Sequence, residues 1–168
     1  MPTTGPAAVG RAAPTLTTAQ VWRALTKASF AVLSHVTPAG EPRSSGVLYA
    51  VADHRLYVAV APESWKARHI AADGHVAVTV PVRRGGILAV LFPIPPAAVS
   101  FRGTALVHPP GAGRDLPAQL SAVLPAELRS STAVIEIRPA GEFVTYGLGV
   151  SLRQMRDPAL ARNRVPVD

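Results

Sequence analysis

Two different periods of hydrophobic residues define the first elements that this chain predicts. From Thr17, which stands three residues before Gln20 as in a capping box, apolar residues recur at helical spacing. This pattern predicts a helix over residues 17–28. From residue 29 onward apolar and polar residues alternate, and this period of two predicts a strand over residues 30–36.

The same alternation returns further along the chain, bounded each time by turn residues such as Gly, Pro and Asp. Further strands are predicted over residues 44–51, 56–61, 75–81, 98–107, 132–138 and 142–146. In the strand over residues 75–81 both faces are fairly apolar, which is typical of a barrel wall that is covered on its outside. Two short helices are predicted over residues 64–72 and 115–124, and Gly74 is expected to end the first of them in a left-handed conformation.

These elements favour a mainly β fold with antiparallel strands. Tight turns join neighbouring strands, whereas parallel strands would need a crossover helix after each one. We therefore predict a six- to seven-stranded antiparallel β-barrel with a few short helices, formed by one domain over residues 17–150. Residues 1–16 are rich in Pro, Ala, Thr and Gly without an apolar period and are expected to be a disordered extension, and residues 151–168 a C-terminal tail or short helix.

The composition excludes several classes of function. The chain has 168 residues and no cysteine, so it forms no disulfide and holds no thiolate catalyst or cysteine-bound metal. Its net charge of +7 comes from 15 arginines and two lysines that are spread along the chain, which disfavours a nucleic-acid surface. The five histidines show no spacing of four residues on a helix, so no metal site is predicted.

The N-terminal residues and the longest apolar stretch indicate where the protein is located. No export signal is recognisable at the N-terminus, so a cytoplasmic location is expected. The longest apolar stretch, residues 86–99, is interrupted by Pro93, Pro95 and Pro96, and it predicts no membrane span. We interpret this stretch as a cover over the barrel or a homodimer interface, with the wall of an apolar substrate pocket as the alternative.

The candidate binding site is the predicted helix start Glu63-Ser64-Trp65-Lys66-Ala67-Arg68. Ser64 is a good N-cap, but Lys66 and Arg68 follow it, and cations in a first turn oppose the helix dipole. A bound phosphate would offset this repulsion, because the helix N–H groups, the Ser64 hydroxyl and the Lys66 ammonium could converge on it. On spacing alone, solvated surface charge balanced by nearby acidic residues is the better explanation.

A resemblance changes that balance. The stretch from Ala61 to Arg68 resembles the segment of the pyridoxamine 5′-phosphate oxidase-like family in which a strand runs into a Ser-x-Lys helix start that binds flavin phosphate. The turn Gly40-Glu41-Pro42 and the strand over residues 99–105 also fall where this family would place them. The resemblance covers about residues 17–146. It implies the FMN-binding split barrel of that superfamily and a homodimer with cofactors between its subunits.

The cofactor-binding residues that the resemblance implies lie on the second and third predicted strands and at the helix start. They are Ser44, Ser45, Gly46, Val47, Ala59, Val60, Ala61, Ser64, Trp65, Lys66, Arg68 and His69. His69 is one turn from Lys66, and packing on the barrel edge explains it as well as a contact with the phosphate does. No residue is identified as a catalytic acid or base.

The chain also departs from the oxidase itself. Trp65 stands where the oxidase has an arginine, and Ser45 and Ala50 stand where its second strand carries basic residues. The resemblance therefore points to the broader flavin and deazaflavin oxidoreductase branch, with coenzyme F-420 or FMN as cofactor and a small apolar conjugated substrate. The alternative is a non-catalytic carrier of a flavin, haem or fatty ligand on the same barrel, with His69 or His75 as a candidate haem ligand.

Overall fold

The structure is a computed structural model that describes residues 16–84, 95–112, 117 and 124–168. The predicted extension over residues 1–16 lies outside these residues except for Leu16. Almost all of the predicted helix over residues 115–124 also lies outside them, as do residues 86–94 of the long apolar stretch.

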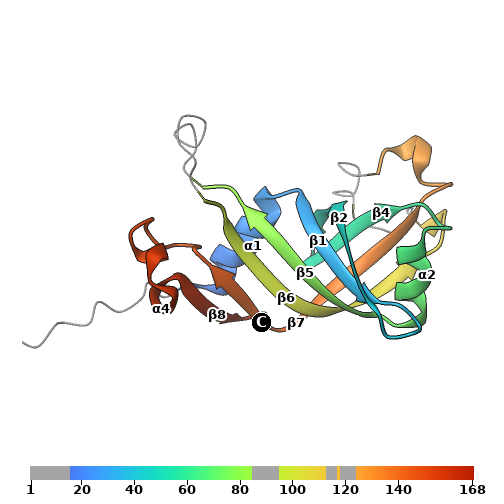
Figure 1. Cartoon of the computed structure of the whole chain (residues 1–168). Helices are drawn as coiled ribbons and strands as arrows, with labels where there is room; N and C mark the ends of the chain where they lie inside the picture. Colours follow the sequence, from blue (N-terminus) through green and yellow to red (C-terminus); the bar gives the residue numbers. More distant parts are fainter. Residues whose placement is uncertain (1–15, 85–94, 113–116, 118–123) are drawn as a thin grey trace, which may run out of the picture.

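One curled antiparallel sheet forms the body of the protein (Figure 1). Its eight strands are β1 (Phe30–Val36), β2 (Pro42–Leu48), β3 (Ala50–Ala52), β4 (Arg55–Val60), β5 (His75–Val82), β6 (Ala97–His108), β7 (Ala133–Tyr146) and β8 (Arg162–Pro166). The order across the sheet is β2-β1-β5-β6-β7-β4-β3, and β8 pairs with β7 beside this path. The mainly β, antiparallel barrel fold predicted from the alternation is confirmed in the form of a half-barrel.

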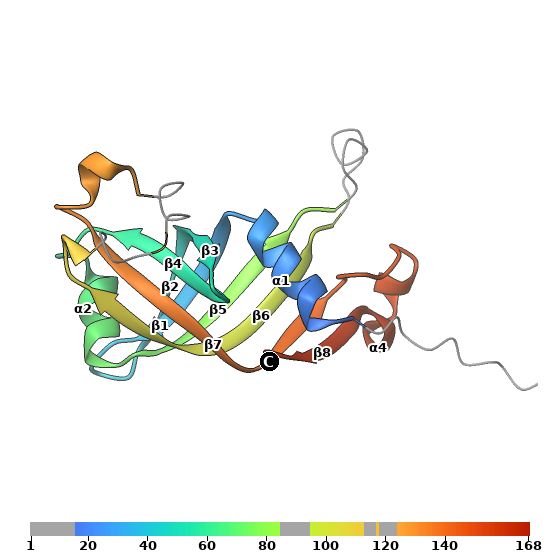
Figure 2. The ribbon, with the colours of Figure 1, turned by 180° about the vertical axis from the view of Figure 1, so that it is seen from behind.

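The helices are short, and the first of them lies across one face of the sheet (Figures 1 and 2). They are α1 (Thr18–Lys27), α2 (Trp65–Ala72), α4 (Pro158–Ala161) and the 3-10 turns η3 (Ala126–Leu128) and η4 (Gln154–Arg156). The predicted capping box of α1 is confirmed: Gln20 N donates to Thr17 Oγ1 at 3.3 Å, and Thr17 N donates to Gln20 Oε1 at 2.8 Å. In the part of the chain that the structure describes, no helix has the length and apolar character needed to cross a membrane.

A single residue, Tyr49, joins the two ends of the sheet. β2 and β3 stand at opposite ends of the strand order, yet the chain passes from one to the other through Tyr49 alone. The predicted strand over residues 44–51 is therefore two strands, because its halves pair with different neighbours: β2 with β1, and β3 with β4. This connection forces the sheet to curl until its two edges lie near one another.

Hydrogen bonds hold both the backbone and the side chain of Tyr49. Its N–H donates to Ser29 O at 3.0 Å, and its hydroxyl donates to Leu25 O at 2.7 Å. Leu25 lies in the last turn of α1, where carbonyl groups lack a donor from their own helix. Burial raises the pKa of the Tyr49 hydroxyl well above its usual value, so the group stays protonated and remains a donor.

The main core lies between α1 and the inner face of the sheet. Trp22 meets Phe143 edge to face, with ring centroids 5.3 Å apart, and Phe143 meets Phe101 in the same way at 5.4 Å. The other face of Trp22 stacks on His54 at 4.8 Å. His54 and Asp53 form the tight β3–β4 turn with positive φ values of 55° and 49°, so this stack ties the hairpin to α1.

Two local expectations need correction. Gly74 is absent from the residues with positive φ, and Asp73 caps α2 instead. A Cβ at Gly74 would lie 2.7 Å from Ala105 O, so close contact with β6 requires this glycine. His75, Ala77 and Thr79 of β5 are exposed, so the described chain leaves the outer face of this strand uncovered.

The C-terminal part of the sheet also differs from the prediction. The strands predicted over residues 132–138 and 142–146 form one strand, β7, which continues through Gly141 at a φ of 77°. β8 was not predicted, because Val165 is its only buried apolar residue and its other residues are polar or exposed. It adds to the sheet by pairing with residues 142–146 of β7.

Replacing Tyr49 by phenylalanine is expected to destabilise the protein. Tyr49→Phe leaves the Leu25 carbonyl buried without a donor, which costs about 1–3 kcal/mol in the free energy of unfolding. Urea denaturation measures this loss.

Tyr146→Phe provides the matched control, since Tyr146 also donates to a carbonyl, Met155 O at 3.1 Å, but is 39% exposed. Water can replace its hydroxyl, so a smaller loss is expected. Equal losses in the two variants would contradict the special role of Tyr49.

Candidate functional site

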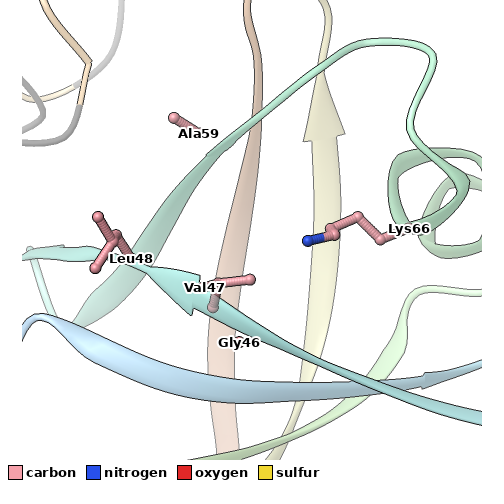
Figure 3. Close-up of a pocket in the computed structure, with 5 residues that line it drawn as sticks. All are labelled: Gly46, Val47, Leu48, Ala59 and Lys66. Atoms are coloured by element: carbon pink, nitrogen blue, oxygen red, sulfur yellow. The ribbon is translucent and has the colours of Figure 1, made fainter.

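A cavity of about 260 Å³ lies where β2 passes β4 and the start of α2. Its lining residues, drawn in Figure 3, are Gly46, Val47, Leu48, Ala59 and Lys66. Three of these come from the end of β2, next to Tyr49, and one comes from β4. The cavity therefore lies at the seam where the two edges of the curled sheet approach one another.

α2 begins directly beside this cavity. Ser64 has an extended backbone, and its hydroxyl oxygen accepts from Ala67 N at 3.3 Å, as an N-cap does. Ser64 N donates to Ala61 O at 3.0 Å, which holds the helix start against the end of β4. Within the described ranges the N–H groups of Trp65 and Lys66 have no acceptor, as expected for a first helical turn.

Lys66 is the one charged residue in the cavity lining. Figure 3 shows its side chain extending from α2 toward β2 and β4. No carboxylate among the described residues forms a salt bridge with it. An ammonium beside apolar walls, next to free helix N–H groups, makes this end of the cavity favourable for an anion.

Trp65 and Arg68 are arranged differently from Lys66. The Trp65 side chain is 70% exposed, and the Arg68 guanidinium carbon lies 4.4 Å from the centroid of its ring. Arg68 also donates from Nη2 to Glu63 O at 3.1 Å. Neither residue is among those that line the cavity. The cation–π contact holds the Arg68 guanidinium on the indole, and its contact with a cofactor stays a prediction.

The remaining predicted site residues occupy three settings. Ser44 lies on the exposed face of β2, where its hydroxyl is 2.7 Å from that of Ser34. The Ser45 hydroxyl is buried and has no hydrogen-bond partner among the residues that the structure describes. Val60 is buried in the core, and Ala61 is exposed.

Gly46, which lines the cavity, also makes room for a neighbouring side chain. A Cβ at this position would lie 2.8 Å from Phe30 Cε2, so the glycine leaves room for the neighbouring ring on β1. Leu48, which the sequence analysis did not single out, follows on the same strand and is 62% exposed. Alternation places Leu48 on an outward face, and only the closure of the seam brings it to the cavity.

Behind Lys66, two histidines meet. His69 of α2 and His35 of β1 lie with Nδ1 and Nε2, respectively, 3.2 Å apart. His35 is only 7% exposed, and its own Nδ1 is buried without a partner in the described structure. His69 was among the residues predicted from the sequence, whereas His35 was not. The available signal was the position of His35 on the inward phase of β1, together with Ala31 and Leu33.

Burial lowers the pKa of His35 below the usual 6.5, and the positive charges of His69, Lys66 and Arg43 lower it further. Two of these neighbours come from α2, and Arg43 comes from β2, where it pairs with His35. His35 is therefore a neutral ring in a cationic setting.

Comparison with known proteins identifies the family of this chain. The sequence profile described as pyridoxamine 5′-phosphate oxidase matches residues 17–144. The chain belongs to that family. The match begins at the cap of α1, ends near the end of β7 and includes every residue that lines the cavity. The resemblance inferred from the Ser-x-Lys helix start and the order of strands is thus confirmed.

Solved structures share the fold at low sequence identity. An F-420 reductase is 20% identical, with a TM-score of 0.51 over 72% of this chain and 93% of its own. An FAD-binding protein from Mesorhizobium loti is 19% identical, with a TM-score of 0.57 over 74% and 88%. A haem-binding protein from Mycobacterium smegmatis is 19% identical, with a TM-score of 0.64 over 91% of this chain and 59% of its own. Comparison with curated proteins finds no match.

Acidification below pH 6.5 is expected to destabilise the protein through His35. The unfolded chain takes up a proton at this residue while the native protein, with its lowered pKa, does not. The free energy of unfolding therefore falls as the pH falls from 6.5 toward the native pKa of His35. Urea denaturation at a series of pH values measures the slope.

Replacing His35 removes this contribution, so His35→Gln should show a shallower slope over the same pH range. His75→Gln is the matched control, because it makes the same change at a histidine whose side chain is 86% exposed. A slope as steep in His35→Gln as in the unaltered protein would show that another group is responsible.

Proposed function

We propose that this chain is an oxidoreductase that uses coenzyme F-420 or FMN to reduce a small, apolar, conjugated substrate. The observation that carries the proposal is the Lys66 ammonium, which enters the seam cavity without a carboxylate partner in the described chain. A charge in this position is stabilised by a bound anion. Family membership makes a phosphorylated cofactor the natural candidate for that anion.

The groups at the start of α2 fit a phosphate. Lys66 supplies a compact positive charge, and the backbone N–H groups of Trp65 and Lys66 supply donors. The Ser64 oxygen accepts from Ala67 N, which leaves the hydroxyl hydrogen available to donate to the phosphate. Arg68 is engaged with Trp65, so Lys66 carries most of the charge in this site.

The walls of the cavity fit the edge of a planar ring. Val47, Leu48 and Ala59 are apolar, and Gly46 brings the backbone of β2 to the surface. When bound and reduced, a flavin or deazaflavin ring supplies a hydride to an acceptor. The chain binds and orients the cofactor and excludes water. Ser45 of β2 and Ala50 of β3 provide no positive charge here, so the anchor is thinner than in pyridoxamine 5′-phosphate oxidase, which favours the deazaflavin over FMN.

The cavity is small for a complete cofactor site. At about 260 Å³ it is below the roughly 300–1,000 Å³ of sites that enclose a whole drug-sized ligand. We infer that a second copy of the chain completes the site, as the family resemblance implies. Exposed Leu48 and Phe30 on the outer face of the neighbouring strands provide apolar surface for such a contact.

A non-catalytic carrier of a flavin, haem or fatty ligand is the second candidate. Lys66 is the one lining residue with a titratable side chain, so the described cavity wall offers little acid or base chemistry to a substrate. Solved structures of this fold include both an F-420 reductase and a haem-binding protein. The fold is thus compatible with either role.

Fluorescence titration tests the proposal directly. F-420 and FMN are added separately to the purified protein, and quenching of their fluorescence gives the dissociation constant. Lys66→Ala is expected to weaken binding by about 10- to 100-fold, the equivalent of one hydrogen bond to a charged group. Absence of quenching with both cofactors would refute the proposal.

Lys27→Ala is the matched control for Lys66→Ala. Lys27 is the other lysine of the chain and is exposed in the last turn of α1, away from the cavity. Its replacement should leave both dissociation constants unchanged.

A second assay separates the two candidate roles. The reduced cofactor is offered a panel of quinones, nitroaromatics and enones in the presence of the protein. Turnover supports the oxidoreductase, whereas tight binding without turnover supports the carrier.

A further inference from the structure

The contact between His35 and His69 constrains where each ring carries its proton. A neutral imidazole has one N–H donor and one bare nitrogen that accepts. His35 Nε2 and His69 Nδ1 lie 3.2 Å apart, so one of them donates and the other accepts. Two arrangements are possible. They differ in whether the second nitrogen of each ring carries a proton or is bare.

In the first arrangement His69 donates from Nδ1. His35 Nε2 is then bare, and the proton of His35 must sit on its Nδ1. That atom is buried without an acceptor in the described structure, so the arrangement leaves an orphaned N–H group. In the second arrangement His35 donates from Nε2, and its Nδ1 is an unpaired acceptor. Among backbone groups, orphaned buried N–H donors are rarer than under-satisfied acceptors, and the same preference applied to the ring nitrogens favours this second arrangement.

An additional proton on the pair does not remove the constraint. If His69 were fully protonated, its Nδ1–H would donate to His35 and would again leave the His35 proton on the buried Nδ1. If His35 were protonated, its charge would be buried close to Lys66 and His69 of α2 and Arg43 of β2. The surroundings therefore favour a neutral pair in which His35 donates the hydrogen bond.

The remaining nitrogen of His69 is available to a ligand. His69 Nε2 makes no hydrogen bond within the described ranges, and it is absent from the buried polar atoms that lack a partner. The residue is partly exposed and stands three positions after Lys66, on the same side of α2. Trp65 borders it, with ring centroids 5.9 Å apart.

We propose that His35 is a positioning residue that fixes His69 as the Nε2–H tautomer, and that this N–H group donates to a phosphate oxygen of the bound cofactor. The identity of the ligand rests on the function proposed above. The same tautomer makes His69 unsuitable as an iron ligand, because iron binds the bare nitrogen of an imidazole. The pair thus favours a phosphorylated ligand over haem at this position.

Nuclear magnetic resonance of the ligand-free protein tests the tautomer. Long-range nitrogen–proton spectra of the histidine rings, recorded above pH 6.5, separate a protonated ring nitrogen from a bare one. The expected result is the same tautomer in both rings: a bare Nδ1 and a protonated Nε2 in His69, and a bare Nδ1 and a protonated Nε2 in His35. A proton on Nδ1 of His69 would overturn the proposal.

Variants of His35 test whether it fixes the ring. His35→Leu removes the donor, so both tautomers of His69 become populated and its Nδ1 resonance should move toward the average of a bare and a protonated nitrogen. His35→Gln keeps an N–H donor and should restore the original resonance. Identical His69 spectra in the unaltered protein and in His35→Leu would show that His35 does not position it. If His35→Leu fails to fold, the comparison of His35→Gln with the unaltered protein still decides the point, because a changed His69 tautomer in His35→Gln would contradict the assignment.

Binding of FMN and riboflavin tests the donation to phosphate, because the two ligands share a ring and differ in the phosphate. His69→Leu should weaken FMN binding by about tenfold and leave riboflavin binding unchanged, whereas His69→Gln, which keeps an N–H group, should lose less. Equal losses for both ligands, or none for FMN, would overturn the phosphate contact.

These results are distinguishable from a failure of the proposed function. If neither F-420, FMN nor inorganic phosphate binds to the unaltered protein, the proposed function and the phosphate contact fall together. The spectra of the ligand-free protein decide the His35–His69 tautomer independently of that outcome.

Discussion

The hydrogen bond from the Tyr49 hydroxyl to the Leu25 carbonyl holds together the part of the fold on which the site depends. One residue joins the two ends of the strand order, and its side chain fastens that junction to the last turn of α1. Because the seam is fixed there, the end of β2 lies beside β4, and the cavity forms between them at the start of α2. α1 thus acts on the site through Tyr49, although none of its residues lines the cavity.

The protein treats two of its charged groups, buried Glu136 and partly exposed Lys66, in different ways. Glu136 of β7 is 4% exposed and is bound by Arg55, Arg138 and His108 at 2.8–3.0 Å. Burial raises the pKa of this carboxyl, but the hydrogen bonds from Arg138 and His108 and the charges of the arginines outweigh that effect and leave the pKa below its usual value. Lys66 has no such partner in the described chain. The charge of Glu136 is thus neutralised within the protein, whereas the charge of Lys66 is available to a ligand.

Local signals in the sequence predicted the elements whose causes are local. The capping box of α1, the turn at Asp53 and His54 and the N-cap at Ser64 depend on neighbouring residues, and all three are observed. Gly74 was misread because a glycine after a helix has two explanations, and the correct one, contact with Ala105 O, comes from a distant strand. Within the site, His35 was missed for the same reason: its partner lies 34 residues away in sequence. The closure of the seam, which brings Leu48 to the cavity, follows from strand pairing that alternation does not encode.

The pairing of β4 with β7 has a consequence for the order of folding. Arg55 and Glu136, which mark this pairing, are 81 residues apart in sequence, whereas the β3–β4 hairpin closes through a tight local turn. Contacts between distant segments carry a large loop-closure entropy and form slowly. On the ribosome, more than a third of the chain must therefore follow β4 before it gains β7, its second neighbour in the sheet. The cavity that β4 borders is completed late, so the ability to bind a ligand marks a chain that has finished folding.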